Sequence, residues 1–141
     1  MKIFLSLKVP RGDAERKSII TALKSVIHAA GHIPFVATEE ITRAGLTNPA
    51  EFMPFVRTHL ADTDLFVLVY HPELRGGLIE AGIAYERKTP IWVCHKVGEK
   101  VSSSLLGCAE KIIEYNEIEI LGEKILTALS KSKKQSRPKR H

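Results

Sequence analysis

The sequence lacks the features that mark several large classes of protein. It contains only two cysteines, Cys94 and Cys108, which form no CxxC pair and have no histidine at metal-ligand spacing, so neither a disulfide scaffold nor a zinc site is predicted. No apolar run is long enough to cross a bilayer. The apolar run at the N-terminus is too short for a secretory signal. We therefore expect a cytoplasmic protein with reduced thiols and no membrane partner.

Familiar catalytic and nucleotide-binding signatures are also missing. The sequence contains no GxxxxGK(S/T) phosphate loop, no GxGxxG fingerprint and no serine in a nucleophile elbow. Its six histidines form no ligand or triad pattern. The sequence therefore predicts neither a metal site nor a bound cofactor.

The net charge of +5 belongs to the C-terminal end of the chain. Six of the 21 lysines and arginines lie in residues 131–141, which contain no acid, so residues 1–130 hold 15 basic side chains against 16 acidic ones. We expect one folded domain over residues 1–130 and a disordered basic tail over residues 131–141. The tail could contact polyanions, or it could simply aid solubility.

Short apolar runs alternate with segments of helical periodicity along the body of the chain. The five predicted strands span residues 2–9, 33–37, 65–70, 90–94 and 111–115. The final helix, residues 119–129, is expected to turn Ile120 inward. Such alternation predicts a Rossmann-like α/β three-layer sandwich, a five-stranded parallel sheet of order 2-1-3-4-5 with helices on both faces. This order would place the ends of strands one, three and four around one crevice.

One stretch, residues 76–85, stands out at the predicted crevice. Gly76 and Gly77 follow a buried strand and are expected to let the backbone turn tightly and approach a ligand closely. The helix that follows carries a single acid, Glu80, among apolar and small residues. A buried carboxylate is costly unless something binds or pairs with it. Glu80 therefore either acts on a ligand or merely benefits from the positive end of the helix dipole.

Two further segments could bind an anion at the same edge. The loop after the first strand, residues 8–13, offers Lys8, Arg11 and backbone N–H groups at a helix N-terminus, although an ordinary turn capped by Asp13 also explains it. Residues 102–104 are three serines at the start of a short helix. They can cap that helix, bind a phosphate, or do both.

Together these segments resemble the nucleoside 2-deoxyribosyltransferase superfamily and, within it, the 2′-deoxynucleoside 5′-phosphate N-hydrolases. The resemblance spans about residues 2–127. Its most specific part is the Glu-x-Gly-x-Ala pattern that begins at Glu80. The segments that carry it, in matching order, are residues 2–6, 61–64, 76–84, 88–90 and 101–107.

The resemblance implies an N-glycosidase that cleaves, or transfers from, the N-glycosidic bond of a (deoxy)nucleoside or its 5′-monophosphate. Glu80 would attack the anomeric carbon of the sugar and form a glycosyl-enzyme, as in retaining glycoside hydrolysis. The loop after the first strand and Ser103 from a second subunit would hold the 5′-phosphate, so a homodimer with a shared site is also implied. The candidate substrate-binding residues are Ser6, Lys8, Arg11, Gly12, Gly76, Gly77, Ser103 and Ser104.

Two positions depart from the family pattern. Leu74 stands six residues before Glu80, where the family has Ser or Asp, and Arg57 stands where the hydrolases have an Asp that assists the leaving base or the sugar. His71 or Glu73 could serve instead as the general acid. A second hypothesis is therefore a non-catalytic module that binds or senses a nucleotide or sugar phosphate. A third is a scaffold whose basic tail binds RNA, DNA or an acidic partner.

Overall fold

A five-stranded sheet runs through the computed structural model of the chain, which describes residues 1–8 and 14–136. The strands are β1 (Lys2–Leu7), β2 (Ile33–Val36), β3 (Leu65–Val69), β4 (Ile91–Lys96) and β5 (Lys111–Tyr115). Their order is β2-β1-β3-β4-β5, and every neighbouring pair is parallel. The strand order and direction predicted from the sequence are confirmed.

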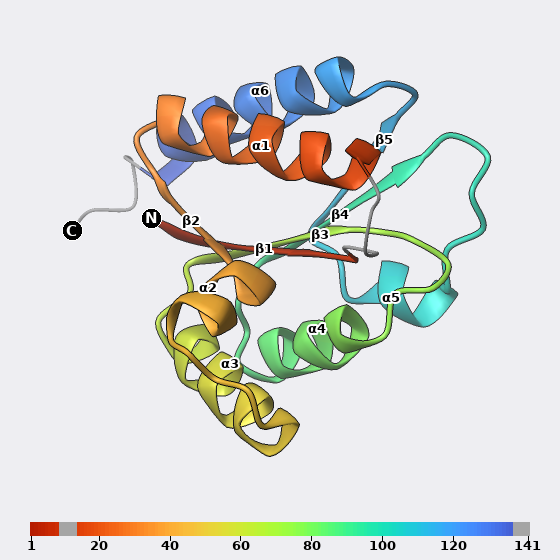
Figure 1. Cartoon of the computed structure of the whole chain (residues 1–141). Helices are drawn as coiled ribbons and strands as arrows, with labels where there is room; N and C mark the ends of the chain where they lie inside the picture. Colours follow the sequence, from red (N-terminus) through yellow and green to blue (C-terminus); the bar gives the residue numbers. More distant parts are fainter. Residues whose placement is uncertain (9–13, 137–141) are drawn as a thin grey trace.

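Helices cover both faces of this sheet, as Figure 1 shows. One layer consists of α1 (Ala14–Ala29) and α6 (Ile118–Ser136). The other consists of α2 (Ala37–Arg43), α3 (Phe52–Ala61), α4 (Gly76–Glu86) and α5 (Ser103–Gly107), with a short 3-10 turn, η1 (Pro49–Glu51), before α3. The fold is the predicted three-layer α/β sandwich.

Alternation along the strands divides the core in two. Successive side chains of a strand point to opposite faces, so Ile3 and Leu5 pack in the cluster under α1 and α6, while Phe4 packs in the cluster on the other face. There Phe4 stacks on Phe66 of β3, with ring centroids 5.3 Å apart. Ser6 is the next residue on the Phe4 face and is buried. The pattern of β1 therefore delivers one hydroxyl group into the layer that holds α4.

Local sequence signals act where they were expected. Gly31 ends α1 with a left-handed backbone, φ +84°, and takes part in a Schellman motif. The side chain of Asn48 accepts a hydrogen bond from a backbone N–H at the start of η1. Pro34 lies in β2, which is an edge strand of the sheet. β4 ends at Lys96, two residues beyond its predicted end.

The last helix differs from its prediction at both ends. α6 begins at Ile118, so that Leu121 and Ile125 share its buried face, and Ile120 is 40% exposed instead of facing inward. The helix continues to Ser136, although a disordered tail was predicted from residue 131. The lysines and glutamine at its end are good helix formers, and extending a helix is easier than starting one. The rest of the predicted tail, residues 137–141, lies outside the described residues.

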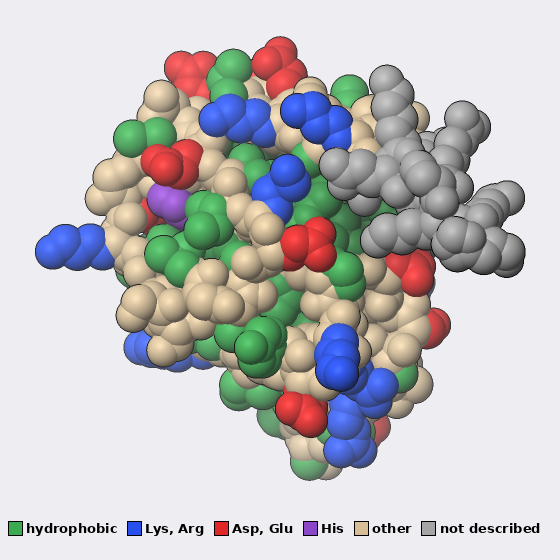
Figure 2. All heavy atoms as spheres, turned by 180° about the vertical axis from the view of Figure 1, so that it is seen from behind, with side chains coloured by type: hydrophobic (Ala, Val, Ile, Leu, Met, Phe, Trp, Pro, Cys, Tyr) green, Lys and Arg blue, Asp and Glu red, His purple; other side chains and the backbone are tan. Residues whose placement is uncertain are grey.

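Charges of both signs are interspersed on the folded body. On the face shown in Figure 2, lysine and arginine side chains alternate with aspartate and glutamate around a central group of hydrophobic side chains. Between β5 and α6 lies a groove of about 400 Å³, lined by Ile112 and Ile120 together with charged side chains of both signs. Basic and acidic side chains are thus mixed on this face, and neither sign of charge forms a single patch there.

Lys88 ends α4 in a left-handed conformation that favours glycine. Its φ is +62°, and the bonds from Lys88 N to Tyr85 O and from Thr89 N to Ala84 O, both 3.0 Å, form the Schellman arrangement. A side chain in this conformation costs about 1–2 kcal/mol, which glycine avoids. Glycine also gives the unfolded chain more conformational freedom, and this offsets part of the gain. We predict that Lys88→Gly raises the free energy of unfolding by about 0.5–1 kcal/mol in urea denaturation. Lys88→Ala should change it little, and a less stable Lys88→Gly protein would contradict the prediction.

Candidate functional site

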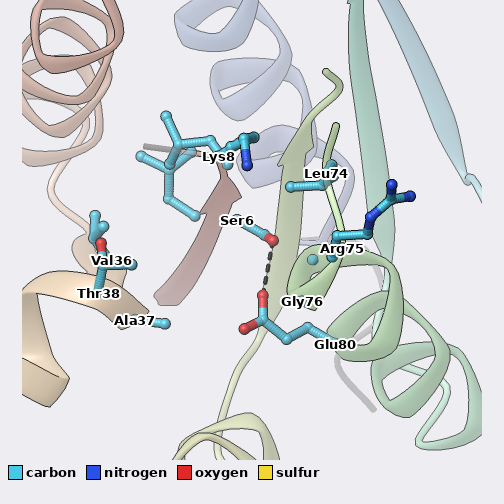
Figure 3. Close-up of a pocket in the computed structure, with 12 residues that line it drawn as sticks. Ser6, Lys8, Val36, Ala37, Thr38, Leu74, Arg75, Gly76 and Glu80 are labelled. Carbon is cyan, nitrogen blue, oxygen red and sulfur yellow. Dashed lines mark hydrogen bonds between the residues drawn. The ribbon is translucent and has the colours of Figure 1, made fainter. Parts of the chain in front are cut away.

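A cavity of about 210 Å³ opens at the carboxyl edge of the sheet (Figure 3). Its wall is formed by residues 5–8 at the end of β1, residues 36–38 where β2 passes into α2, residues 74–77 at the start of α4, and Glu80. The carboxyl ends of parallel strands are the usual ligand site of open α/β sheets. A crevice was predicted around the ends of strands one, three and four, but the cavity lies between β1, β2 and α4, and neither β3 nor β4 contributes a residue to its wall.

Glu80 is the acid of this cavity. Its side chain comes from the second turn of α4, and only 8% of the residue is exposed. Ser6 Oγ donates a hydrogen bond to Glu80 Oε1 at 2.8 Å, which joins β1 to α4 (Figure 3). Among the described residues, no lysine or arginine forms an ion pair with it. The carboxylate is therefore held by one hydroxyl group and otherwise faces the cavity.

Burial governs the ionisation of Glu80. Removal from water disfavours the charged form and raises the pKa of Glu80 to about 7, while the hydrogen bond from Ser6 opposes the rise. Glu80 is the fifth residue of α4, beyond the first turn in which the helix dipole stabilises a carboxylate. The dipole therefore does not account for this acid. A costly carboxylate that faces a cavity is the pattern of a functional site.

Gly76 and Gly77 are the first two residues of α4 and do not form the tight turn predicted for them. Neither has a positive φ, and the hydrogen-bonded turn comes just before them, over residues 71–74. A Cβ on Gly77 would stand 2.7 Å from Ser6 Oγ and 2.8 Å from Leu74 Cδ1, whereas the same position on Gly76 is open. The backbone at Gly77 therefore lies close to the side chains of Ser6 and Leu74 and not to a ligand. The absence of a side chain at Gly77 leaves room for the hydrogen bond from Ser6 to Glu80.

The two glycines are predicted to respond oppositely to alanine. Gly77→Ala should lower the free energy of unfolding by about 1–3 kcal/mol, because the new methyl group overlaps Ser6 and Leu74. Gly76→Ala should be neutral or stabilising by up to about 1 kcal/mol, because its methyl group meets nothing and alanine favours a helix. Denaturant unfolding of the two variants side by side tests this prediction. Equal changes in the free energy of unfolding of the two variants would contradict the predicted overlap at Gly77.

Lys8, Leu74 and Arg75 also line the cavity. Lys8 follows β1, and Leu74 and Arg75 precede α4 (Figure 3). Leu74 is buried and presents methyl groups where the resemblance led us to expect a polar residue. Arg75 and residues 36–38 were not predicted as site residues. For residues 36–38, the order 2-1-3-4-5 is the signal that could have indicated them, because it places the end of β2 beside the end of β1.

Neither proposed general acid lies at the cavity wall. His71 and Glu73 belong to the turn before α4, where Glu73 N donates to His71 Nδ1 at 3.0 Å, and this turn brings Leu74 to the cavity in their place. Arg57 is exposed on α3 and lines a separate hollow against α4. Across the described residues, Glu80 is the one acid in the wall, and no histidine lines it.

The structure places only some of the predicted phosphate-binding residues at the cavity. Ser102 caps α5, because its side chain accepts a hydrogen bond from a backbone N–H, so the predicted capping role is confirmed for this serine. Ser103 and Ser104 are exposed at the start of α5 and do not line the cavity of their own subunit. Arg11 and Gly12 lie outside the described residues. Lys8 is the described residue of that loop that lines the cavity.

The remaining cysteine, histidine and acidic side chains do not cluster. Within residues 1–8 and 14–136, no three of them lie close enough together to hold a metal ion. In the same ranges, no helix combines the length and the hydropathy of a membrane span. Cys94 and Cys108 are free thiols, and complete burial raises the pKa of Cys94 to about 12.

Comparisons with known proteins define the fold. No protein-family model matches the sequence, and no curated protein is significantly similar to it. Among solved structures, a CMP N-glycosidase, BcmB, from Clostridium botulinum is 17% identical with a TM-score of 0.71, covering 89% of this chain and 97% of that one. A 2-deoxyribosyltransferase from Bacillus psychrosaccharolyticus is 17% identical with a TM-score of 0.68, covering 92% and 96%. A conserved protein from Enterococcus faecalis V583 is 13% identical with a TM-score of 0.61, covering 90% and 98%. This chain shares their fold over nearly its whole length.

Proposed function

We propose that the protein is an N-glycosidase of the nucleoside 2-deoxyribosyltransferase superfamily, which cleaves, or transfers from, the N-glycosidic bond of a nucleoside or its 5′-monophosphate. The observation that carries this proposal is Glu80, a buried carboxylate with a raised pKa and no ion pair within the described residues, facing a small cavity. The fold shared with a CMP N-glycosidase and a 2-deoxyribosyltransferase supports it.

In the proposed reaction, Glu80 Oε2 attacks the anomeric carbon of the sugar. A bond forms between Oε2 and this carbon as the bond from the carbon to the base nitrogen breaks, and the base leaves with that electron pair. Water, or the nitrogen of a second base, then attacks the same carbon and releases the carboxylate. Ser6 holds Oε1, which orients Oε2 toward the sugar. The cavity, about 210 Å³, is smaller than the roughly 300–1,000 Å³ of most ligand pockets and suits a sugar ring.

The leaving base receives no proton from a second acid of the described wall. Glu80 is the one acid there, and Leu74 occupies the neighbouring position. Loss of a general acid typically lowers a rate by about 10²–10⁴-fold. The proposed enzyme therefore favours bases that leave readily or that take a proton from solvent at the open mouth of the cavity.

A dimer through the outer face of α4 is part of the proposal. Leu78, Ile79 and Tyr85 are 42%, 58% and 58% exposed on this helix, which also carries Glu80. Exposed apolar side chains gathered on one helix indicate an interaction surface. A partner on this face would lie beside the cavity, as the shared site implied by the resemblance requires. Sedimentation should give a dimer for the wild type and a monomer for Ile79→Asp; a monomeric wild type would overturn this assembly.

Chromatographic detection of free base from a panel of nucleosides and 5′-monophosphates tests the proposed activity. The wild type should release base, and Glu80→Ala should release none above the uncatalysed rate. No release by the wild type on any member of the panel, or equal release by Glu80→Ala, would overturn the proposal.

A second candidate function is binding of a nucleotide or sugar phosphate without turnover. The apolar Leu74 wall and the lack of a second acid among the described lining residues favour it. Thermal unfolding with the same panel separates the two functions, because a bound ligand raises the melting temperature whether or not it is cleaved. Stabilisation without any product would identify a sensing module.

A further inference from the structure

β5 is the last strand of the sheet and has a neighbouring strand, β4, on one side only (Figure 1). Tyr115 O accepts a hydrogen bond from Val97 N at 3.0 Å, so the backbone of Tyr115 faces β4. Alternate residues of a strand bond to the same side, and Ile112 and Glu114 therefore direct their N–H and C=O groups away from the sheet. These groups form the free edge of β5. Such an edge is a template for pairing with another strand.

A groove of about 400 Å³ runs along this free edge. All of residues 111–114 line it. Successive side chains of a strand point to opposite faces of the sheet, so a groove lined by consecutive residues follows the edge of the strand and not one face. The opposite wall is one stripe of α6 at helical spacing, which consists of Ile120, Glu123, Lys124, Thr127, Ala128 and Lys131. The groove therefore offers an extended segment a place beside β5.

One side chain of the groove already occupies the free edge. Lys124 Nζ donates a hydrogen bond to Glu114 O at 2.6 Å. Throughout residues 1–8 and 14–136, no other side chain bonds to the outward backbone groups of Ile112 and Glu114. Lysine is a residue that proteins use on exposed strand edges, because its charge hinders pairing with a further strand. Lys124 thus covers one of the outward carbonyl groups.

The charges of the groove match those of a second copy of the same groove. The bond between Lys124 and Glu114 sets the start of α6 beside the end of β5, so Glu114 and Glu123 share one end of the groove. Lys131 lies two turns beyond Lys124 on α6, and Lys111 lies three residues before Glu114 on β5, so both are about 10 Å from that end. An antiparallel pair with a two-fold axis places the basic end of each groove against the acidic end of the other.

We propose that the free edge of β5 is a docking surface for a second copy of this chain and that Lys124 keeps it closed. In the antiparallel pair, Ile112 of one copy lies opposite Glu114 of the other, and the two residues exchange both backbone hydrogen bonds. One of these bonds needs the Glu114 oxygen that Lys124 occupies, so both copies of Lys124 must leave before the edges can join. This surface is separate from the cavity, and the inference does not depend on the proposed function.

Sedimentation of Lys124→Met tests the proposal. The measurement is made in the Ile79→Asp background, which disrupts the proposed α4 interface, so that a change of mass reports on β5. Loss of a charged hydrogen bond changes an equilibrium constant by about 10–100-fold, and pairing gives up two such bonds, so Lys124→Met should strengthen association by about 10²–10⁴-fold. It should sediment at twice the mass of its parent. The matched control is Lys131→Met, a lysine of the same groove that does not bond to the β5 backbone, and it should keep the parent mass.

Amide hydrogen exchange locates the contact. In Lys124→Met the amides of Ile112 and Glu114 should exchange more slowly as protein concentration rises, and in Lys131→Met they should not. Unchanged mass of Lys124→Met at its highest soluble concentration would overturn the proposal. An assembly without slowed exchange at these two amides would also overturn it, because the contact would then lie elsewhere. Equal protection of the two amides in the parent protein would show that Lys124 does not close the edge.

Discussion

Replacing Glu80 with glutamine is expected to raise the free energy of unfolding at pH 8 by about 3 kcal/mol. Burial raises the pKa of Glu80 from 4.5 to about 7, so the folded protein resists ionising this side chain while the unfolded chain does not. At pH 8 the wild type must keep a buried charge that has only the Ser6 hydroxyl as a described partner. Glutamine has nearly the same shape and carries no charge, so the penalty is removed.

The direction of the pH dependence follows from the same shift. Between pH 4.5 and about 7 the folded state binds more protons at Glu80 than the unfolded state, so this group's contribution to stability is complete below pH 4.5 and is lost as pH rises through about 7. Urea unfolding at pH 5 and pH 8 should therefore show a gap between Glu80→Gln and the wild type that opens with rising pH. Glu123→Gln, at an exposed position of α6, is the control and should open no gap. A constant gap at both pH values would contradict the burial of a titrating carboxylate.

Ser6→Ala is expected to move the pH profile of the proposed reaction upward. The attacking carboxylate must be ionised, so kcat/KM of the wild type should rise with pH with a midpoint near 7. The Ser6 hydroxyl donates to the ionised form, and a hydrogen bond to a charged group contributes about 1.5–3 kcal/mol, which corresponds to roughly 1–2 pH units. The midpoint of Ser6→Ala should therefore lie at least about one unit higher, and its rate at pH 6 should fall about tenfold or more.

The shape of the profile distinguishes tuning of Glu80 from structural damage. If Ser6 acts on the ionisation of Glu80, much of the lost rate returns above pH 9, where the carboxyl is ionised in both proteins. A uniform loss at every pH would mean that Ser6→Ala distorts the cavity and that the hydroxyl does not tune the acid.

The sheet and its acid could be predicted from the sequence because their signals are local and repeated. Continuous apolar runs separated by helical periodicity indicate buried parallel strands, and few right-handed topologies then remain. Glu80 stands alone among apolar and small residues in the helix that follows such a strand, which places it near the carboxyl edge. Alternation along β1 sends Ser6 to the same face as Phe4. Ser6 and Glu80 therefore meet because of sequence patterns that each extend over only a few residues.

The other site residues could not be predicted because a turn decides which side chain faces the cavity. Over residues 71–74 the sequence offers a histidine and a glutamate that could act as acids, but the turn directs Leu74 to the wall. Arg75 was missed because arginine is an unusual N-cap residue and breaks the preference that locates helix starts. Residues 131–136 continue α6, where composition alone suggested a disordered tail from residue 131.

The direct passage from β2 into α2 has a consequence for how this protein responds to a ligand. Val36 ends the strand and Ala37 begins the helix, with no loop between them, and both line the cavity. β2 has one neighbouring strand, and a partly exposed ion pair, Lys24 to Glu39 at 2.7 Å, links α2 to α1. Segments held this weakly open more often than the centre of a sheet. Occupancy of the cavity should therefore slow amide hydrogen exchange over residues 33–43 more than in β3. Within residues 33–43, β2 and α2 should exchange together as one cooperative unit.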